Sequence, residues 1–394
     1  MRLVWIDRRC RRAALVAVML ACASGCGGCG SKPDYPPNLT FPSRTDRLVL
    51  RSPEQQPAKT NEPGKIDEEL AALDSLGGQT VDPATVSADA RAPLDKFLKD
   101  SFGTPANPII HGDAGIIDAS NHLGLNAARL TEGGKLFRSH CLQCHNLAGD
   151  GRGPAGLWVI PYPRDFRRGA FKFVSSSEGS KPRRADLLRT LAEGLRGTAM
   201  PSFSRIPEGE RELLAWYVMY LAIRGEVEFE SLRELLAGQP NDPPAKLKAV
   251  LAEWEKAENA PAVPEVPDDG EPGNPTHLEA VRRGYKLFTA KPEATAKSEK
   301  SCIECHAEFG RKPLLRFDVW GTVAKPANFT EPPLKGGTRP EEVFARIRFG
   351  IAPVGMPAHP KLKDREVWDL VRFVRSAPYP RELPPDVFAA VYPK

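Results

Sequence analysis

One five-residue pattern occurs twice in this chain and constrains its fold and chemistry more than any other feature. The copies are Cys141-Leu142-Gln143-Cys144-His145 and Cys302-Ile303-Glu304-Cys305-His306. Two thiols three positions apart can bond the two vinyl groups along one side of a porphyrin, and the imidazole that follows can bind its iron. The pattern therefore predicts two covalently attached c-type haems, with His145 and His306 as proximal ligands.

A zinc-binding Cys/His cluster is the alternative interpretation of each motif. Zinc would draw four ligands from the two clusters together, but the motifs lie 161 residues apart, each in its own helical repeat. Haem is therefore favoured. The chain has eight cysteines, four in the first thirty residues and four in the motifs, so its body has none left for a disulfide framework.

The segments around the two motifs are diverged copies of one unit. Before the motifs, residues 133–137 (GGKLF) match residues 284–288 (GYKLF). After the motifs, residues 187–194 match residues 343–350; both have a helical period and end at glycine, as a helix C-terminus does. The second unit also carries ten extra residues between Phe288 and Cys302, which predicts a loop.

The end of each unit repeats as well. A methionine followed by proline comes six residues after each helix-ending glycine, at Met200 and Met356. Each unit then closes on an amphipathic pattern, which predicts helices over residues 210–224 and 364–376.

This order of features resembles class I cytochrome c, twice over, across a little over half of the sequence. The resemblance implies a mainly α fold: two tandem cytochrome c-type helical domains with irregular loops, joined by a Pro-rich linker after a poorly ordered N-terminal tether. In that family the first and last helices cross at a glycine–aromatic contact. Here the contact would pair Gly133 or Gly134 and Phe137 with Trp216 or Tyr217, and Gly284 and Phe288 with Trp368.

The distal ligands are expected to be Met200 and Met356, because they occupy identical places in the repeat. Met219 lies within an apolar helical pattern and is expected in the core. His359, three residues after Met356, is the rival ligand for the second iron. His140, His111 and His122 are not expected to be ligands, although a distant ligand remains open.

The N-terminus has the pattern of an export signal. Four arginines within residues 8–12 precede a short apolar run over residues 13–23, which is too short to span a bilayer. Ala23-Ser24-Gly25-Cys26 resembles a bacterial lipobox, so Cys26 is the predicted lipidation site; a simple cleaved signal and an uncleaved anchor are the alternatives. We expect a location on the periplasmic side of a bacterial membrane, held there by lipid.

Composition and local patterns divide the chain into six segments. Proline is frequent (39 residues), and it concentrates in the segments that are expected to be irregular. Within these segments, weak helical patterns cover residues 66–76 and 92–100. The expected divisions are a signal peptide (1–25), a largely irregular tether (26–121), the first cytochrome c domain (122–232), a linker with a short helix (233–275), the second domain (276–378) and a surface tail (379–394).

Charge is informative only locally. The net charge of +5 is small for this length and does not indicate a nucleic-acid partner. Residues 152–196 hold ten basic and four acidic side chains. Two interpretations stay open: a solvated face with one or two arginines near haem propionates, or a docking patch for an acidic redox partner. Residues 161–163 (PYP) and Phe166, Phe171 and Phe173 are expected to cover the first porphyrin.

Iron held by both imidazole and thioether leaves no open position for a substrate. The resemblance therefore implies a non-enzymatic carrier of single electrons between respiratory donor and acceptor proteins, possible also as the haem c subunit of an oxidase or dehydrogenase complex. The alternative is a dihaem peroxidase-like enzyme, which also has two such motifs but must open one iron to peroxide.

Overall fold

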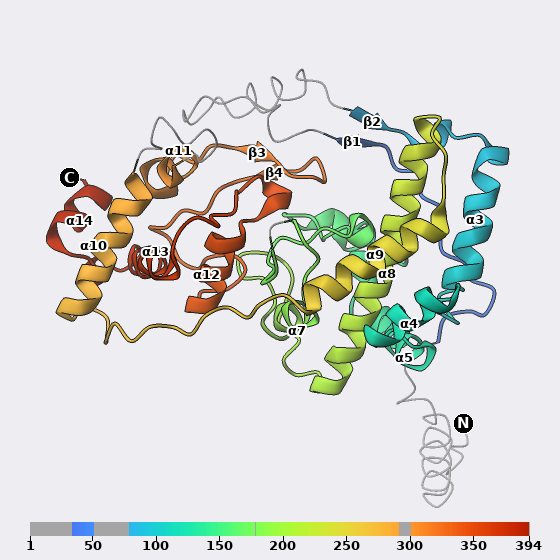
Figure 1. Ribbon diagram of the computed structural model, residues 1–394, viewed down its shortest axis with the longest axis horizontal. Helices are drawn as coiled ribbons and strands as arrows, with labels where there is room; N and C mark the ends of the chain where they lie inside the picture. The colour runs from blue at the N-terminus through green and yellow to red at the C-terminus, as the bar shows by residue number, and fades with distance from the viewer. Residues whose placement is uncertain (1–33, 51–78, 178, 291–300, 394) are drawn as a thin grey trace, which may run out of the picture.

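The computed structural model describes residues 34–50, 79–177, 179–290 and 301–393, which form two helical lobes (Figure 1). The first lobe (residues 34–50 and 79–258) contains the first motif, and the second lobe (residues 263–393) contains the second motif. The mainly helical class with two tandem cytochrome c-type domains is confirmed. The predicted signal, Cys26, the helical pattern over 66–76 and most of the insertion before Cys302 lie outside the described residues.

Helices dominate the first lobe. They are α3 (Ala88–Phe102), α4 (Ala114–His122), α5 (Ala127–His140), α6 (Leu142–His145), α7 (Arg184–Glu193), α8 (Glu208–Leu236) and α9 (Pro243–Glu258). Short 3-10 turns η1 (Pro83–Thr85), η2 (Gly156–Trp158) and η3 (Phe166–Arg168) lie between them, and β1 (Leu48–Leu50) pairs antiparallel with β2 (Gln79–Val81).

The second lobe repeats part of this order. Its helices are α10 (Pro275–Thr289), α11 (Cys302–Cys305), α12 (Pro340–Phe349), α13 (Asp364–Ser376) and α14 (Pro385–Val391). Its 3-10 turns are η4 (Ala307–Gly310), η5 (Ala352–Val354) and η6 (Pro380–Glu382), and β3 (Arg316–Phe317) pairs antiparallel with β4 (Val323–Ala324). The helices before each methionine, α7 and α12, end at Gly194 and Gly350 as the sequence predicts.

Glycines allow the first and last helices of each unit to cross closely. In the first lobe α5 crosses α8, and a Cβ on Gly133 would lie 2.4 Å from the carbonyl oxygen of Leu213. The aromatic partner of Phe137 is Tyr217, with ring centroids 5.3 Å apart. The predicted contact therefore forms, through Tyr217 rather than Trp216.

The second crossing uses a different aromatic residue from the predicted one. A Cβ on Gly284 of α10 would lie 2.0 Å from the carbonyl oxygen of Asp369 in α13. Phe288 packs on Phe373, with ring centroids 5.2 Å apart, whereas Trp368 packs on Phe344 of α12 at 4.4 Å. The prediction of Trp368 was wrong because Phe373 lies on the face of α13 turned to α10, and Trp368 lies on the face turned to α12.

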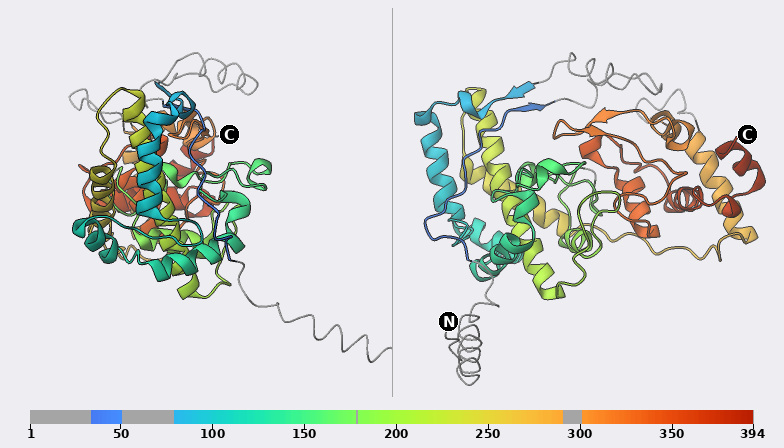
Figure 2. Two further views of the ribbon diagram at one scale, coloured as in Figure 1. Left: turned by 90° about the vertical axis from the view of Figure 1, so that its right-hand side faces the viewer. Right: turned by 180° about the vertical axis from the view of Figure 1, so that it is seen from behind.

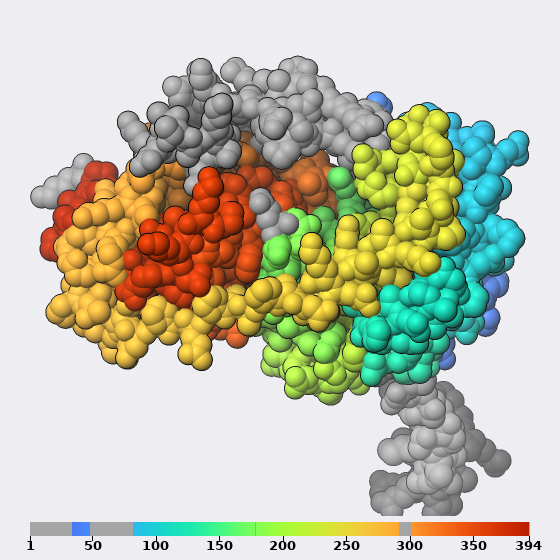
Figure 3. Space-filling model, viewed as in Figure 1, coloured from blue at the N-terminus to red at the C-terminus, as the bar shows by residue number. Residues whose placement is uncertain are grey.

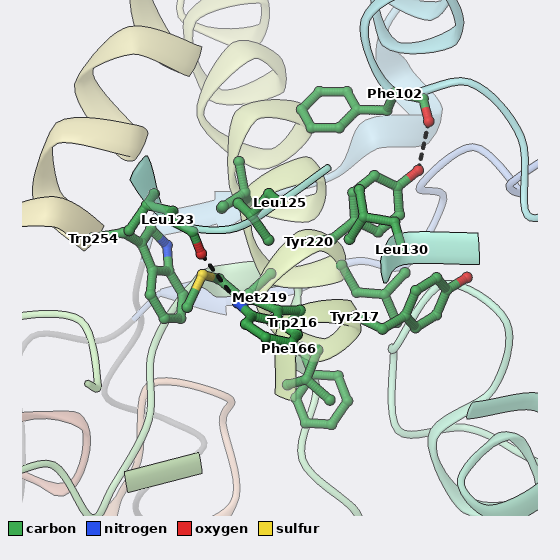
Figure 4. Close-up of a cluster of buried hydrophobic side chains, with 14 of the residues drawn as sticks. Phe102, Leu123, Leu125, Leu130, Phe166, Trp216, Tyr217, Met219, Tyr220 and Trp254 are labelled. Atoms are coloured by element: carbon green, nitrogen blue, oxygen red, sulfur yellow. Dashed lines mark hydrogen bonds between the residues drawn. The ribbon is translucent and has the colours of Figure 1, made fainter. Parts of the chain in front are cut away.

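The expected tether, residues 26–121, is not largely irregular where it is described. Helices α3 and α4 pack on the first lobe, and their apolar side chains join its core together with Phe41. Tyr220 of α8 donates a hydrogen bond to the carbonyl oxygen of Phe102 over 2.6 Å, and Trp216 donates one to that of Leu123 over 3.1 Å (Figure 4). Sequence periodicity missed this packing because α8 is buried on nearly all sides over residues 214–224, so that it carries a second apolar surface besides the one that meets α5.

The other two expected irregular segments also contribute to cores. In the predicted linker, 233–275, α9 packs on α8 and α4 and places Leu247, Leu251 and Trp254 in the first core. The remainder runs in extended form along the surface from the first lobe to the second (Figure 3). In the predicted tail, 379–394, α14 buries Val387 and Val391 in the second core, so this segment is part of the domain rather than a surface wrap.

Candidate haem-binding sites

The first motif sits where α5 passes into α6. The amide of His145 donates to the carbonyl oxygen of Cys141 over 2.8 Å, which closes one helical turn around the motif. That turn gathers both thiols and the imidazole at one place. Cys141 is buried and Cys144 is half-buried, and neither forms a disulfide.

His145 is held in the orientation that an iron ligand requires. Its Nδ1 lies 3.0 Å from the carbonyl oxygen of Arg164, and because a carbonyl only accepts, Nδ1 carries the proton. Its ring stacks on Phe166 with centroids 4.5 Å apart. Burial lowers the pKa of His145 to about 4, so the imidazole is neutral at pH 7 and Nε2 keeps its lone pair for a metal.

The second motif reproduces this arrangement with different residues. Nδ1 of His306 donates to the carbonyl oxygen of Ala327 over 3.1 Å, and its ring stacks on Phe329 at 4.6 Å. Burial lowers the pKa of His306 to about 4 as well. The repeat seen in the sequence is therefore also a repeat of histidine geometry.

Both motifs line one continuous cavity of about 1150 Å³. Pockets for single small ligands usually measure about 300–1,000 Å³. This cavity lies between the lobes, and its walls are mostly apolar. The predicted site residues that line it are Cys141, Cys144, His145, Met200, Cys302, Cys305, His306, Met356 and also His359.

The two methionines reach the cavity on equivalent loops. The carbonyl oxygen of Met200 accepts from the amide of Leu195 over 3.1 Å, and that of Met356 accepts from the amide of Ile351 over 2.9 Å. Each loop folds back against the glycine that ends the preceding helix. A Cβ on Gly194 would lie 2.7 Å from the carbonyl oxygen of Met200, and one on Gly350 would lie 2.5 Å from that of Met356.

The other candidate ligands differ in whether they line the cavity. Met219 is fully buried in the first core, as predicted (Figure 4). His140 lines the cavity, but His111 and His122 do not. Met356 and His359 both line it.

The loop between the first motif and α7 forms much of the cavity wall. Pro161, Tyr162, Phe166, Phe171 and Phe173 all line it, in the place expected for a cover of the first porphyrin. The outer side of the same loop is apolar and exposed at Trp158 and Ile160.

Many cations of the basic stretch point inward instead of toward solvent. Arg167 is buried and pairs with Asp165 and Asp46, and Lys181 is buried and pairs with Glu226. Arg164 lines the cavity, and burial lowers its pKa to about 10. Neither a solvated face nor a docking patch therefore describes Arg167 and Lys181, whereas Arg164 lies at the cavity wall, where an arginine near a haem propionate is expected.

Sequence reasoning missed the cations that the second lobe brings to the cavity. Arg316, Lys335 and Arg346 line it, and burial lowers the pKa of Arg346 to about 10. Arg316 also places Nη2 3.5 Å from Sγ of Cys305. A single basic residue carries no such signal in sequence, because only the fold decides which wall it joins.

These residues fit haem. The cavity offers two thiol pairs, two neutral imidazoles with Nδ1 already engaged, two thioethers, apolar walls and cations suited to propionates. Zinc would need a cluster of ligands, and within the described ranges no three His, Cys, Asp or Glu side chains gather to hold a metal ion.

Comparison with known proteins agrees with the fold and the motifs. Residues 128–218 and 282–374 each match the family described as "Cytochrome C oxidase, cbb3-type, subunit III". The matches run from α5 into α8 and from α10 into α13, so each contains one motif and one methionine. Both matched regions are therefore cytochrome c domains, arranged in tandem, and such domains imply covalently bound haem c and electron transfer.

One solved structure is similar to this chain. It is a chain of the "reducing HAO-like protein complex" of Kuenenia stuttgartiensis, 24% identical, with 62% of this chain and 95% of that chain covered and a TM-score of 0.44. No curated protein matches the chain significantly.

Proposed function

We propose that this protein is an exported dihaem cytochrome that carries single electrons between a respiratory donor and an acceptor protein. The observation that carries the proposal is the single cavity lined by two complete ligand sets. His145 with Met200 would hold one iron, and His306 with Met356 the other. Haem iron ligated in this way supplies one-electron redox chemistry, and thioether ligation raises its reduction potential.

The protein's own residues prepare this chemistry. The carbonyl groups of Arg164 and Ala327 fix the orientation of the two imidazoles, a role that outer-shell hydrogen bonds have at most metal-bound histidines. Phe166 and Phe329 stack on the two imidazole rings and limit their rotation. If these residues hold the two irons as proposed, neither iron would have a position left for a substrate, which would favour a carrier over an enzyme.

The test is substitution of one methionine. In Met200→His we expect two haems per chain in the pyridine haemochrome spectrum, as in the wild type, but only about half of the near-infrared band of sulfur-ligated ferric haem. Met219→Leu, which alters a core methionine, should keep the whole band. A full band in Met200→His would contradict the ligand assignment, and fewer than two haems in the wild type would contradict the dihaem proposal.

The same spectrum decides between Met356 and His359. His359→Ala should leave the near-infrared band intact, and Met356→His should remove about half of it. Turnover of hydrogen peroxide by the reduced wild type, or ready binding of carbon monoxide at an iron, would instead favour the peroxidase alternative.

We further propose a lipid anchor at Cys26 on the periplasmic side, supported by the small residues before it. Asp34, eight residues later, pairs with Lys135 over 3.3 Å, and Tyr35 lies under Arg138. Eight residues span at most about 29 Å, so an anchored chain would keep the first lobe close to the membrane surface. Within the described parts, no helix has the length and hydropathy to cross a membrane. Mass spectrometry of the mature N-terminus tests the anchor.

A donor or acceptor complex is part of the same proposal. An oxidase or a dehydrogenase would exchange electrons with one lobe, and the shared cavity would connect that lobe to the other. Co-purification from membranes with the neighbouring redox proteins would identify the donor or acceptor.

A further inference from the structure

A tight turn of the second lobe reaches into the first lobe. It connects β3 to β4 and comprises residues 318–322 (Figure 2). Asp318 holds it together: its carboxylate accepts from the amides of Trp320 and Thr322 over 3.1 and 3.0 Å, and from the Thr322 hydroxyl over 2.7 Å. The turn is therefore a preorganised unit rather than a loose loop.

The side chain of Trp320 contacts two consecutive residues of the first lobe. The Arg164 guanidinium carbon lies 3.5 Å from the centroid of the Trp320 ring. The indole N–H of Trp320 donates to the carbonyl oxygen of Asp165 over 3.0 Å. The negative face of the indole ring attracts the guanidinium cation, so this contact is favourable.

The two residues before Trp320 also contact charged side chains of the first lobe. Lys172 of the first lobe pairs with Asp318 over 3.1 Å, and the Asp318 side chain is fully buried. Arg168 donates to the carbonyl oxygen of Val319. The turn is thus anchored to the first lobe at three successive positions.

Arg164 connects this anchor to the first haem site. Its carbonyl oxygen is the group that accepts from Nδ1 of His145. The next carbonyl, that of Asp165, is the acceptor for Trp320. One short backbone segment is therefore fixed by the proximal histidine on one side and by the second lobe on the other.

The turn also contacts the methionine loop of its own lobe. The amide of Val319 donates to the carbonyl oxygen of Pro353 over 2.9 Å. Pro353 lies in η5, within the loop that the Ile351–Met356 bridge closes. The turn thus touches the histidine support of one site and the methionine loop of the other.

We propose that Trp320 is a positioning residue for the first haem site, contributed by the second lobe, which sets the orientation of His145 through Arg164 and Asp165. This inference rests on the proposed dihaem function. A change in imidazole orientation alters the ligand field and the potential at the first iron. Docking of the second lobe is thereby part of what defines the first redox centre.

The test compares Trp320→Ala with Trp320→Phe in the full-length holoprotein. We measure the potential of each haem by redox titration and the g-values of each ferric haem by electron paramagnetic resonance, and assign the first haem as the one whose signal changes in Met200→His. In Trp320→Ala we expect the first haem's oxidised-to-reduced ratio at a fixed potential to change by about tenfold, which corresponds to about 59 mV for a one-electron couple.

Trp320→Phe keeps a ring for Arg164 but loses the donor to Asp165, so we expect a smaller shift in the same direction. The matched control is Trp158→Ala, the same substitution at an 86% exposed site of the first lobe, which should leave both haems unchanged. Unchanged g-values and potential of the first haem in Trp320→Ala would overturn the proposal. Equal shifts of both haems would also overturn it, because they indicate general loosening.

A double-mutant cycle tests whether Trp320 acts on His145 through Arg164. Arg164→Met removes the cation but keeps the carbonyl group, and it should shift the first haem in the same direction as Trp320→Ala. If both act on one segment, their combined effect will be smaller than the sum of the single effects, whereas additive effects would overturn a route through Arg164. If this inference fails but the proposed function holds, the wild type will still show two haems and the full near-infrared band of sulfur-ligated haem. If the proposed function fails, one of those two measurements will fail as well.

Discussion

Single glycines decide how closely the paired helices of each unit approach. Gly133 and Gly284 lie where a Cβ would meet the backbone carbonyl oxygen of the crossing helix, at 2.4 and 2.0 Å. Backbone cannot swing aside as the end of a side chain can, so these positions exclude any larger residue. Each crossing therefore sets the position of the motif that follows α5 or α10 relative to the last helix of its unit, α8 or α13.

A residue-scale prediction follows from Gly284. In Gly284→Ala we expect the second lobe to lose about 1–3 kcal/mol of unfolding free energy, because the added methyl overpacks the crossing. Thermal unfolding followed by haem absorbance measures the loss. The matched control is Gly209→Ala in α8, where nothing lies within 4 Å; it should be neutral or slightly stabilising, and an equal loss there would contradict the steric explanation.

At the scale of elements, α8 organises the first lobe. The sequence pattern predicts its end at Arg224, but the helix continues to Leu236 through Gly225. Gly225 is needed there, since a Cβ would lie 2.4 Å from Cα of Arg167 in η3. The extension is stabilised by burial of Val227 and Leu232 rather than by local propensity.

The same extension contains a buried carboxyl group that makes stability depend on pH. Burial raises the pKa of Glu226 from 4.5 to about 7, while Lys181 opposes the shift. Between these pH values the folded protein holds a proton that the unfolded chain has released. This contribution to stability is therefore complete below pH 4.5 and is lost as the pH rises through about 7, at a cost of about 3 kcal/mol.

Glu226→Gln removes this titration. Relative to the wild type, the variant should gain up to about 3 kcal/mol of unfolding free energy as the pH rises from 4.5 to above 7. Denaturant unfolding at a series of pH values measures the difference. Glu230→Gln alters a half-exposed carboxylate on the same helix and should follow the wild-type curve. A constant difference between Glu226→Gln and the wild type would refute the assignment of Glu226.

At the scale of the whole molecule, the lobes are joined by more than the connecting segment. Arg339 pairs with Glu193 over 2.6 Å and Arg189 with Glu342 over 3.5 Å, both across the interface, in addition to the turn that contains Trp320. Together with the shared cavity, these contacts indicate two sites held as a fixed pair. Flexible tethering of the haems, as the Pro-rich linker alone suggests, is therefore not the arrangement of the described residues.

Electron exchange between the two sites should accordingly be intramolecular. After rapid photoreduction of one haem, we expect equilibration with the other to be first order, with a rate that does not change with protein concentration. Transient absorbance measures this rate. Reduction by an external protein donor serves as the contrast, because that rate must rise with concentration; a concentration-dependent exchange between the haems would rule out the fixed pair.

The sequence by itself determined which residues are candidates for the chemistry: two thiol pairs, the histidine after each, and methionines at equivalent places in a repeat, because covalent attachment and ligation depend on residue type and local spacing. It also predicted α7, α12 and α13, whose periodicity and end signals are local. Only the tertiary structure decided that Phe41, α3, α9 and α14 contribute to cores, that Phe373 replaces Trp368 at the second crossing, and that both sites line one cavity. Those outcomes depend on contacts between residues far apart in the chain, and a pattern of neighbouring residues does not specify them.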